Sequence, residues 1–280
     1  MYPVWFKLAW IDVPSFTALM VLALGAGLAL TWGAARHADL PPADVLDVAL
    51  IAVLVGVIGA RAGYVAVNWD YYHRHTNEIV QVWQGGLMWH SGWAGGVIGA
   101  AVASAWRKLD LRAVLSALTP GLMAGAALGW IGCYLAGAAY GREVFPGDRW
   151  WFLAADLPDM YNLRNPRFAT QMLGAGWAVV CFGISNIAPP KEEDWRMANS
   201  RFTTGGIRFA VAMMFYSAGT FVLGFTRGDA VPMLGAWRLD QVMDVGIVVA
   251  GILYVLSSLV IQIAAVKPEI TFPRVPPGRS

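Results

Sequence analysis

The 280-residue sequence is poor in charge. Only 14% of its residues are Asp, Glu, Lys or Arg, while 58% are hydrophobic. A typical soluble domain carries roughly 25% charged residues. A chain of this composition could not cover its own surface with groups that water solvates. The sequence therefore excludes a soluble globular protein and predicts an integral membrane protein.

Net charge and cysteine are also scarce. Twenty Lys and Arg against 18 Asp and Glu leave a formal charge of +2, too little to indicate nucleic-acid binding. Cys133 and Cys181 both lie in apolar stretches, with neither a CxxC motif nor a histidine beside them. We interpret them as small core residues rather than a disulfide or a redox pair. We expect no metal and no cofactor apart from bound phospholipid.

Apolar runs, glycine and tryptophan are abundant. The chain has 31 glycines and 14 tryptophans, as is typical of helices packed closely in lipid with aromatic anchors at the interfaces. A membrane-spanning helix takes about 20 apolar residues. Seven stretches reach this length: 14–35, 45–69, 87–106, 114–137, 168–188, 207–226 and 242–266. We predict an all-α protein with seven transmembrane helices in one domain, residues 1–266, and a Pro-rich tail, residues 267–280.

Basic residues in the loops orient the predicted bundle. With the N-terminus outside, every short cytoplasmic loop except the first carries a basic cluster, as at Arg107, Lys108 and Arg112. We therefore expect the N-terminus outside and the C-terminus in the cytoplasm. Residues 138–167 then form one extended extracytoplasmic loop. Residues 76–86 are too short to cross the bilayer and predict an interfacial or re-entrant segment.

In the long loop, Trp150 and Trp151 stand beside Arg149. This pattern is typical of an interfacial aromatic belt, and ligand stacking is the alternative.

Arg61 and His90 fall inside predicted spans, where an uncompensated charge is costly. Arg61 could bind the phosphate of a lipid headgroup, or it could form an internal ion pair or reach the interface. His90 could be a proton acceptor, or simply a histidine with satisfied hydrogen bonds. It follows Gln84, Gly85 and Gly86, which would make a polar and closely packed entry for a headgroup.

Other polar residues have simpler interpretations. Tyr216, in the middle of the sixth stretch, needs a hydrogen-bond partner if it is buried. Outside that helix, Arg227, Asp229, Arg238 and Asp240 are expected to form surface ion pairs of little energetic weight.

Several strings together resemble the prolipoprotein diacylglyceryl transferase family. They are GARAGYV at 59–65, NWDYY at 68–72, VWQGGLMWHSGWAGGVIG at 82–99 and TPGLMAGAALGWIGCYLAGAAYGR at 119–142. The resemblance implies seven transmembrane helices in the bacterial cytoplasmic membrane, with the N-terminus outside. It also implies transfer of diacylglyceryl from phosphatidylglycerol to the cysteine thiol of a prolipoprotein. His90 matches the functional histidine of the family, and Arg61 matches an arginine of its second helix.

The chain departs from the family pattern where the reaction would occur. The pattern Gly-Arg-Ile-Gly-Asn-Phe-x-Asn-Gly-Glu is replaced at 129–138 by GWIGCYLAGA, so that Trp130 stands for the arginine. In the sixth helix Thr220 and Gly224 stand for an arginine and a glutamate, and near the N-terminus Thr17 stands for a tyrosine. These losses remove cations that would stabilise a phosphate leaving group.

The replacements favour a non-catalytic protein, which binds lipid or serves as a structural subunit of a larger membrane complex, photosynthetic or respiratory. Its partners would be membrane lipids and other integral membrane subunits. The alternative is an active transferase that modifies prolipoprotein, with His90 and Tyr216 catalytic and with Arg61, Arg142 and Arg227 on the headgroup. A transporter is disfavoured, because the sequence has neither an inverted repeat nor paired broken helices.

Overall fold

A computed structural model describes residues 4–8, 11–159, 161, 163–186 and 205–265 of the chain. The described part contains seven long helices, and each coincides with one of the predicted apolar stretches to within a few residues at its ends. They are α1 (Ser15–His37), α2 (Pro42–Val67), α4 (Trp89–Arg107), α5 (Leu111–Ala136), α6 (Thr170–Asn186), α8 (Gly205–Gly224) and α9 (Leu239–Ala265).

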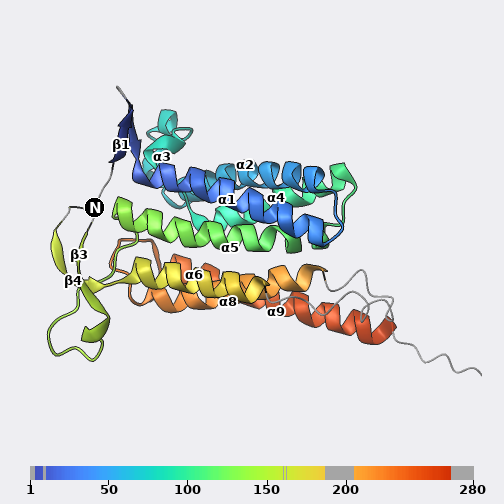
Figure 1. Ribbon diagram of the computed structural model, residues 1–280. Helices are drawn as coiled ribbons and strands as arrows, with labels where there is room; N and C mark the ends of the chain where they lie inside the picture. The colour runs from blue at the N-terminus through green and yellow to red at the C-terminus, as the bar shows by residue number, and fades with distance from the viewer. Residues whose placement is uncertain (1–3, 9–10, 160, 162, 187–204, 266–280) are drawn as a thin grey trace, which may run out of the picture.

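The long helices lie roughly parallel in one bundle, with α5 between two groups (Figure 1). α1, α2 and α4 lie on one side of α5, and α6, α8 and α9 lie on the other. One core cluster forms around Met123 of α5 and Met213 of α8, and another around Val48 of α2 and Val114 of α5. α5 therefore contributes to both cores.

Five of these helices, α1, α2, α5, α8 and α9, are long and apolar enough to cross a membrane. Their outward faces carry exposed aliphatic residues such as Val21, Leu54 and Val260, which suit lipid. Over the residues that the structure describes, α6 has 17 residues and α4 is rich in glycine and carries His90 and Ser91, so neither reaches the length and hydropathy of a span there. The described chain is thus a predominantly helical membrane protein.

Glycines allow α2 and α4 to approach closely. A β-carbon at Gly59 would lie 2.7 Å from the carbonyl oxygen of Ser91, and one at Gly95 would lie 2.7 Å from the carbonyl oxygen of Val55. Both distances are too short for any side chain. Glycine at these two positions therefore lets the backbones of the two helices touch.

The short elements gather at the end of the bundle where the chain begins (Figure 1). They are the hairpins β1 (Val4–Leu8) with β2 (Ile11–Pro14), β3 (Ala154–Pro158) with β4 (Arg164–Phe168) and β5 (Met233–Leu234) with β6 (Trp237–Arg238), the short helix α3 (Trp69–Tyr72), and the 3-10 turns η1 (Thr76–Glu78), η2 (Val82–Gln84) and η3 (Trp151–Leu153). The predicted long loop thus contains an antiparallel hairpin. The predicted tail, residues 267–280, lies outside the described residues.

The α2–α4 contact gives a first prediction. Gly95→Ala should lower the free energy of unfolding by about 1–3 kcal/mol, because the helices must separate to admit the methyl group. Gly25→Ala in α1 is the matched control, since nothing lies within 4 Å of that position and alanine favours a helix. Denaturant titration in mixed micelles measures both. Equal stability of the two variants would contradict the close packing.

Candidate functional site

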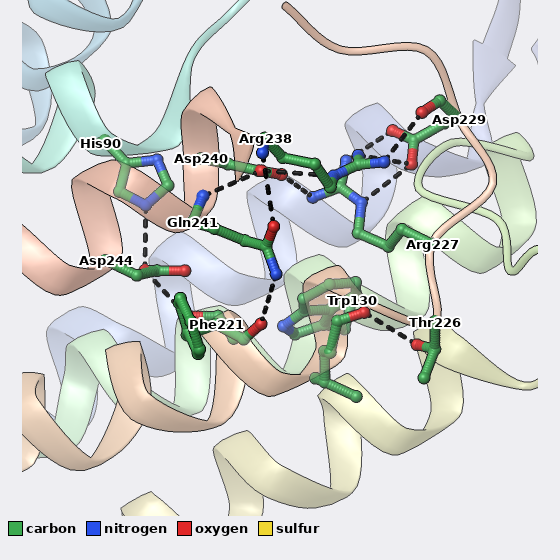
Figure 2. Close-up of polar contacts among 12 residues, drawn as sticks. His90, Trp130, Phe221, Thr226, Arg227, Asp229, Arg238, Asp240, Gln241 and Asp244 are labelled. Atoms are coloured by element: carbon green, nitrogen blue, oxygen red, sulfur yellow. Dashed lines mark hydrogen bonds and ion pairs between the residues drawn. The ribbon is translucent and has the colours of Figure 1, made fainter. Parts of the chain in front are cut away.

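A histidine and a carboxylate meet inside the bundle. His90, at the start of α4, has its Nε2 atom 3.0 Å from Oδ1 of Asp244, in the second turn of α9, and their side chains are only 11% and 3% exposed. Thr220 of α8 donates its hydroxyl to the same carboxylate oxygen at 2.9 Å. Figure 2 shows the imidazole pointing toward this carboxylate.

This contact determines which nitrogen of His90 can accept a proton. An ionised Asp244 only accepts hydrogen bonds, so Nε2 must carry the hydrogen and Nδ1 carries the lone pair of the neutral ring. The described part of the chain offers Nδ1 no hydrogen-bond partner. The carboxylate would also stabilise the imidazolium that forms when Nδ1 takes a proton. The pair can therefore act chemically as an oriented base.

Tyr216 has the hydrogen-bond partner that its burial requires. Trp130 of α5 donates its indole N–H to the Tyr216 hydroxyl at 3.1 Å, and the Trp89 ring lies 5.7 Å from the Tyr216 ring. The indole of Trp130 fits against α6 because residue 174 is glycine, and a methyl group there would overlap the ring. The residue that replaces the expected arginine is therefore firmly packed and neutral.

Gln241 fills the space beside Gly224. A β-carbon at Gly224 would lie 2.6 Å from Cγ of Gln241, and the Gln241 side-chain amide donates to the Phe221 carbonyl at 3.0 Å. Gln241 is 3% exposed, so this contact is inside the protein. The three residues that stand for the charged residues of the family pattern thus have other contacts. Trp130 donates to Tyr216, Thr220 donates to Asp244, and Gln241 fills the space beside Gly224.

Four charged residues form a closed cluster between α8 and α9 (Figure 2). Arg227 pairs with Asp229 and with Asp240 at 2.9 Å, and Arg238 pairs with the same two carboxylates at 3.2 and 3.3 Å. The expected ion pairs are therefore present, but the side chains are 13–21% exposed, so the pairs are half-buried rather than at the surface. Burial lowers the pKa of Arg227, but the hydrogen bond and charge of Asp229 outweigh burial and leave the pKa raised.

The cluster fixes the beginning of α9. Asp240 is in its first turn, and Asp244 lies four residues further on the same helix face. Gln241 also receives a backbone N–H from Arg238 at 3.4 Å. The cluster therefore helps to set the positions of both side chains that reach into the bundle from α9.

Arg61 is buried and donates to four backbone carbonyls. Its guanidinium contacts the carbonyl oxygens of Glu78 at 2.5 Å, Ile79 at 2.8 Å, Gly85 at 2.8 Å and Gly86 at 3.1 Å. These residues belong to the segment that the sequence predicted to be interfacial or re-entrant. The headgroup role of Arg61 stays a prediction, and it would require these bonds to be exchanged for phosphate oxygens.

The contacts of Arg61 also bear on His90. Gly85 and Gly86 adopt φ angles of 89° and 72°, which glycine accepts readily. Two residues later the Met88 N–H donates to the Ala60 carbonyl at 3.0 Å, so the chain entering α4 is held against α2. Arg61 is thus the residue that binds the carbonyls of these glycines, and their grouping with His90 as an entry for a headgroup stays a prediction.

Three of the predicted headgroup residues, Gln84, Arg142 and Arg227, are not bonded to His90 within the described chain. Gln84 is exposed and bonds to Gln81. Arg142 is exposed, places its guanidinium 5.0 Å from the Phe168 ring, and has no acidic partner in the described residues. Its neighbour Gly141 forms a β-bridge with Arg227, so the two arginines lie close along the backbone. No hydrogen bond or ion pair among the described residues joins Gln84, Arg142 or Arg227 to His90.

The sequence reasoning missed Asp244. This carboxylate is the third residue of the last apolar stretch, 242–266, and a charge inside a span calls for a partner. Pairing it with the histidine of another span would have identified the contact. Its position close to Asp240, at the edge of the stretch, hid that signal.

Comparison with known proteins identifies the family of the chain. The model of the prolipoprotein diacylglyceryl transferase family matches residues 3–257, nearly the whole chain. The chain belongs to this family. Relatives named phosphatidylglycerol–prolipoprotein diacylglyceryl transferase include a protein of Geobacillus kaustophilus, 31% identical over 82% of this chain and 83% of its own, and one of Thermosynechococcus vestitus, 27% identical over 88% of each. A Streptococcus mutans protein of that name is 28% identical over 90% of this chain and 93% of its own.

Membership of the family, together with the apolar helices, identifies a multi-pass protein of the bacterial cytoplasmic membrane. The resemblance inferred from the sequence is confirmed. The roles assigned to individual site residues stay predictions.

The charged cluster yields a second prediction. Asp229→Ala should lower the free energy of unfolding by about 1–3 kcal/mol, because Arg227 and Arg238, which are half-buried, would each lose one of their two carboxylates. Asp156→Ala is the matched control, since Asp156 and Arg164 form an exposed pair at 3.8 Å that contributes little. Denaturant titration distinguishes the two. A small loss of unfolding free energy in both variants would show that the cluster contributes no more than surface ion pairs do.

A third prediction concerns Arg61. Arg61→Leu should lower the free energy of unfolding by about 3 kcal/mol, because it leaves several carbonyls without their donor. Arg36→Leu, an exposed position in the last turn of α1, should change it little. Proteolysis of the 76–86 segment provides a local readout, and faster cleavage is expected only in the Arg61 variant. Unchanged cleavage would show that other contacts hold this segment.

Proposed function

We propose that this protein is an active phosphatidylglycerol–prolipoprotein diacylglyceryl transferase. The observation that carries the proposal is the buried hydrogen bond between His90 and Asp244, in a chain that belongs to the transferase family. An oriented imidazole is what thiol alkylation needs, because the thiolate and not the thiol is the nucleophile. The names of the relatives agree with this activity.

In the proposed reaction, His90 Nδ1 takes the proton of the prolipoprotein cysteine. The thiolate sulfur then bonds to the glyceryl carbon that carries the phosphate, the bond from that carbon to the phosphate oxygen breaks, and glycerol phosphate leaves with the electron pair. Asp244 stabilises the imidazolium through Nε2. Arg142, an exposed guanidinium without an acidic partner in the described chain, is the cation we assign to the leaving phosphate.

We further propose seven spans with the N-terminus outside. The long helices alternate in direction, and the bundle places the hairpins and the long loop at the end where the chain begins (Figure 1). α4 and α6 need not be as apolar as the other helices, because each packs against neighbours within the bundle. This arrangement supports the orientation inferred from the basic residues of the loops.

One observation favours a second candidate, a lipid-binding or structural subunit without catalysis. Arg227 and Arg238 are neutralised by Asp229 and Asp240, and Trp130 closes against Tyr216 where an arginine was expected. A site with its cations already paired would hold a phospholipid without stabilising the departure of its phosphate. The two candidates make opposite predictions for turnover.

A thioether-forming assay with phosphatidylglycerol and a lipobox peptide tests the proposal. We expect turnover by the wild-type protein and a loss of at least about 10²-fold for His90→Ala, because the thiol then lacks its proton acceptor. Asp244→Asn should also be slower, since a neutral amide does not stabilise the positive charge that forms on the ring in the reaction. Ser257→Ala, on an exposed part of α9, is the control that should keep full activity.

Two results would contradict the proposal. Absence of turnover in a folded wild-type protein that retains phospholipid supports the second candidate. Turnover that His90→Ala leaves unchanged removes the base from the mechanism, even if the family activity remains.

A further inference from the structure

The long loop presents an aromatic surface that the bundle does not cover. Residues 145–153, here called the aromatic loop, include Phe145 at 64%, Trp150 at 49% and Phe152 at 73% exposure. The loop is nevertheless ordered by its own hydrogen bonds. Asp148 accepts from the Phe145 N–H at 2.9 Å, and the Trp151 N–H donates to the Asp148 carbonyl at 3.0 Å. The exposure of these rings is therefore a property of an ordered loop.

The aromatic loop lies beyond the ends of α6 and α8 and to one side of them, outside the outline of the helices (Figure 1). Long helices that cross a bilayer lie roughly along its normal, so a segment just beyond the helix ends and beside them lies where headgroup region and water meet. Its side chains decide which of the two suits it.

A second apolar surface is found at the same end. Residues 232–237, PMLGAW, contain no charge and are all exposed, and they form the hairpin of β5 with β6. Trp237 packs on Phe221 and Phe225, with ring centroids 5.8 and 6.0 Å apart, and Phe225 is itself exposed. The outer surface of α8 therefore continues into this hairpin without a polar break.

The side chains suit the headgroup region. The Arg149 guanidinium lies 5.6 Å from the Trp150 ring, which places a cation beside aromatic surface. Tryptophan and arginine together are typical of the boundary between acyl chains and headgroups, because each has an apolar body and a polar end. A water-exposed loop would gain nothing from four large aromatic residues in nine positions.

We propose that the aromatic loop and the β5–β6 hairpin are two interfacial anchors, and that their partner is the bilayer surface on the N-terminal side. Both flank the Arg227 cluster, because Gly141 ahead of the loop bridges to Arg227 and Arg238 belongs to β6. The anchors would hold the beginning of α9, and with it Asp244, at a fixed depth below the headgroups. This proposal does not depend on catalysis.

Nitroxide accessibility tests the anchors in the full chain reconstituted into vesicles of phosphatidylethanolamine and phosphatidylglycerol. Single labels are attached at Phe152→Cys and Leu234→Cys, both exposed positions, in a background with Cys133→Ala and Cys181→Ala. We expect oxygen to relax both labels more than a water-soluble nickel chelate does. A label at Val222→Cys, on the exposed face of α8, is the lipid reference, and one at Asp156→Cys is the water reference.

Nickel accessibility equal to that of the Asp156 label would overturn the proposal, and so would labels shielded from both reagents, as a covering protein chain would make them. If the cysteine-free background does not fold, hydroxyl-radical footprinting of the wild-type chain replaces it. Oxidation of Trp150 and Phe152 in the vesicles should then be several-fold lower than that of exposed Tyr161. Equal oxidation of the three would exclude anchoring.

Discussion

A charged group that is removed from water inside a membrane is costly unless it finds a partner within the protein, and this constraint explains the central polar contacts of the described structure. Arg61 is the clearest case, because this cation in the second apolar stretch donates hydrogen bonds to four carbonyls of one short segment. The carbonyls of that segment in turn receive their hydrogen-bond donor from the guanidinium. One buried charge therefore holds both ends of the segment 76–86 against α2, just ahead of the helix that carries His90.

The same requirement connects the helices on the α8 and α9 side. His90, Thr220 and Asp244 join α4, α8 and α9 through one carboxylate, while the Arg227 cluster closes the turn between α8 and α9. Glycine provides the complement on the other side, since Gly59 and Gly95 let α2 and α4 meet backbone to backbone. Each half of the bundle thus adds its own kind of contact to its hydrophobic core, polar contacts on the α8 and α9 side and close backbone approach between α2 and α4.

The positions of the helices could be predicted from the sequence, because an apolar run of about 20 residues has few alternatives in lipid. The contacts between helices could not. Tyr216 was expected to need a partner, but nothing local identifies Trp130, which comes from another helix 86 residues away in the chain. Arg227 was expected at the surface because its neighbours are hydrophilic, whereas the fold closes two arginines and two aspartates on one another.

Asp244 was missed for a related reason: the importance of a charge depends on what faces it, and sequence distance hides that. Its contact with Thr220 links side chains of three helices. Replacing Thr220 would remove one donor from the carboxylate that also binds His90, and any side chain at position 174 would overlap the Trp130 indole. Substitutions at these positions are therefore interdependent, and a change at one of them is tolerated only if its neighbour on another helix changes as well.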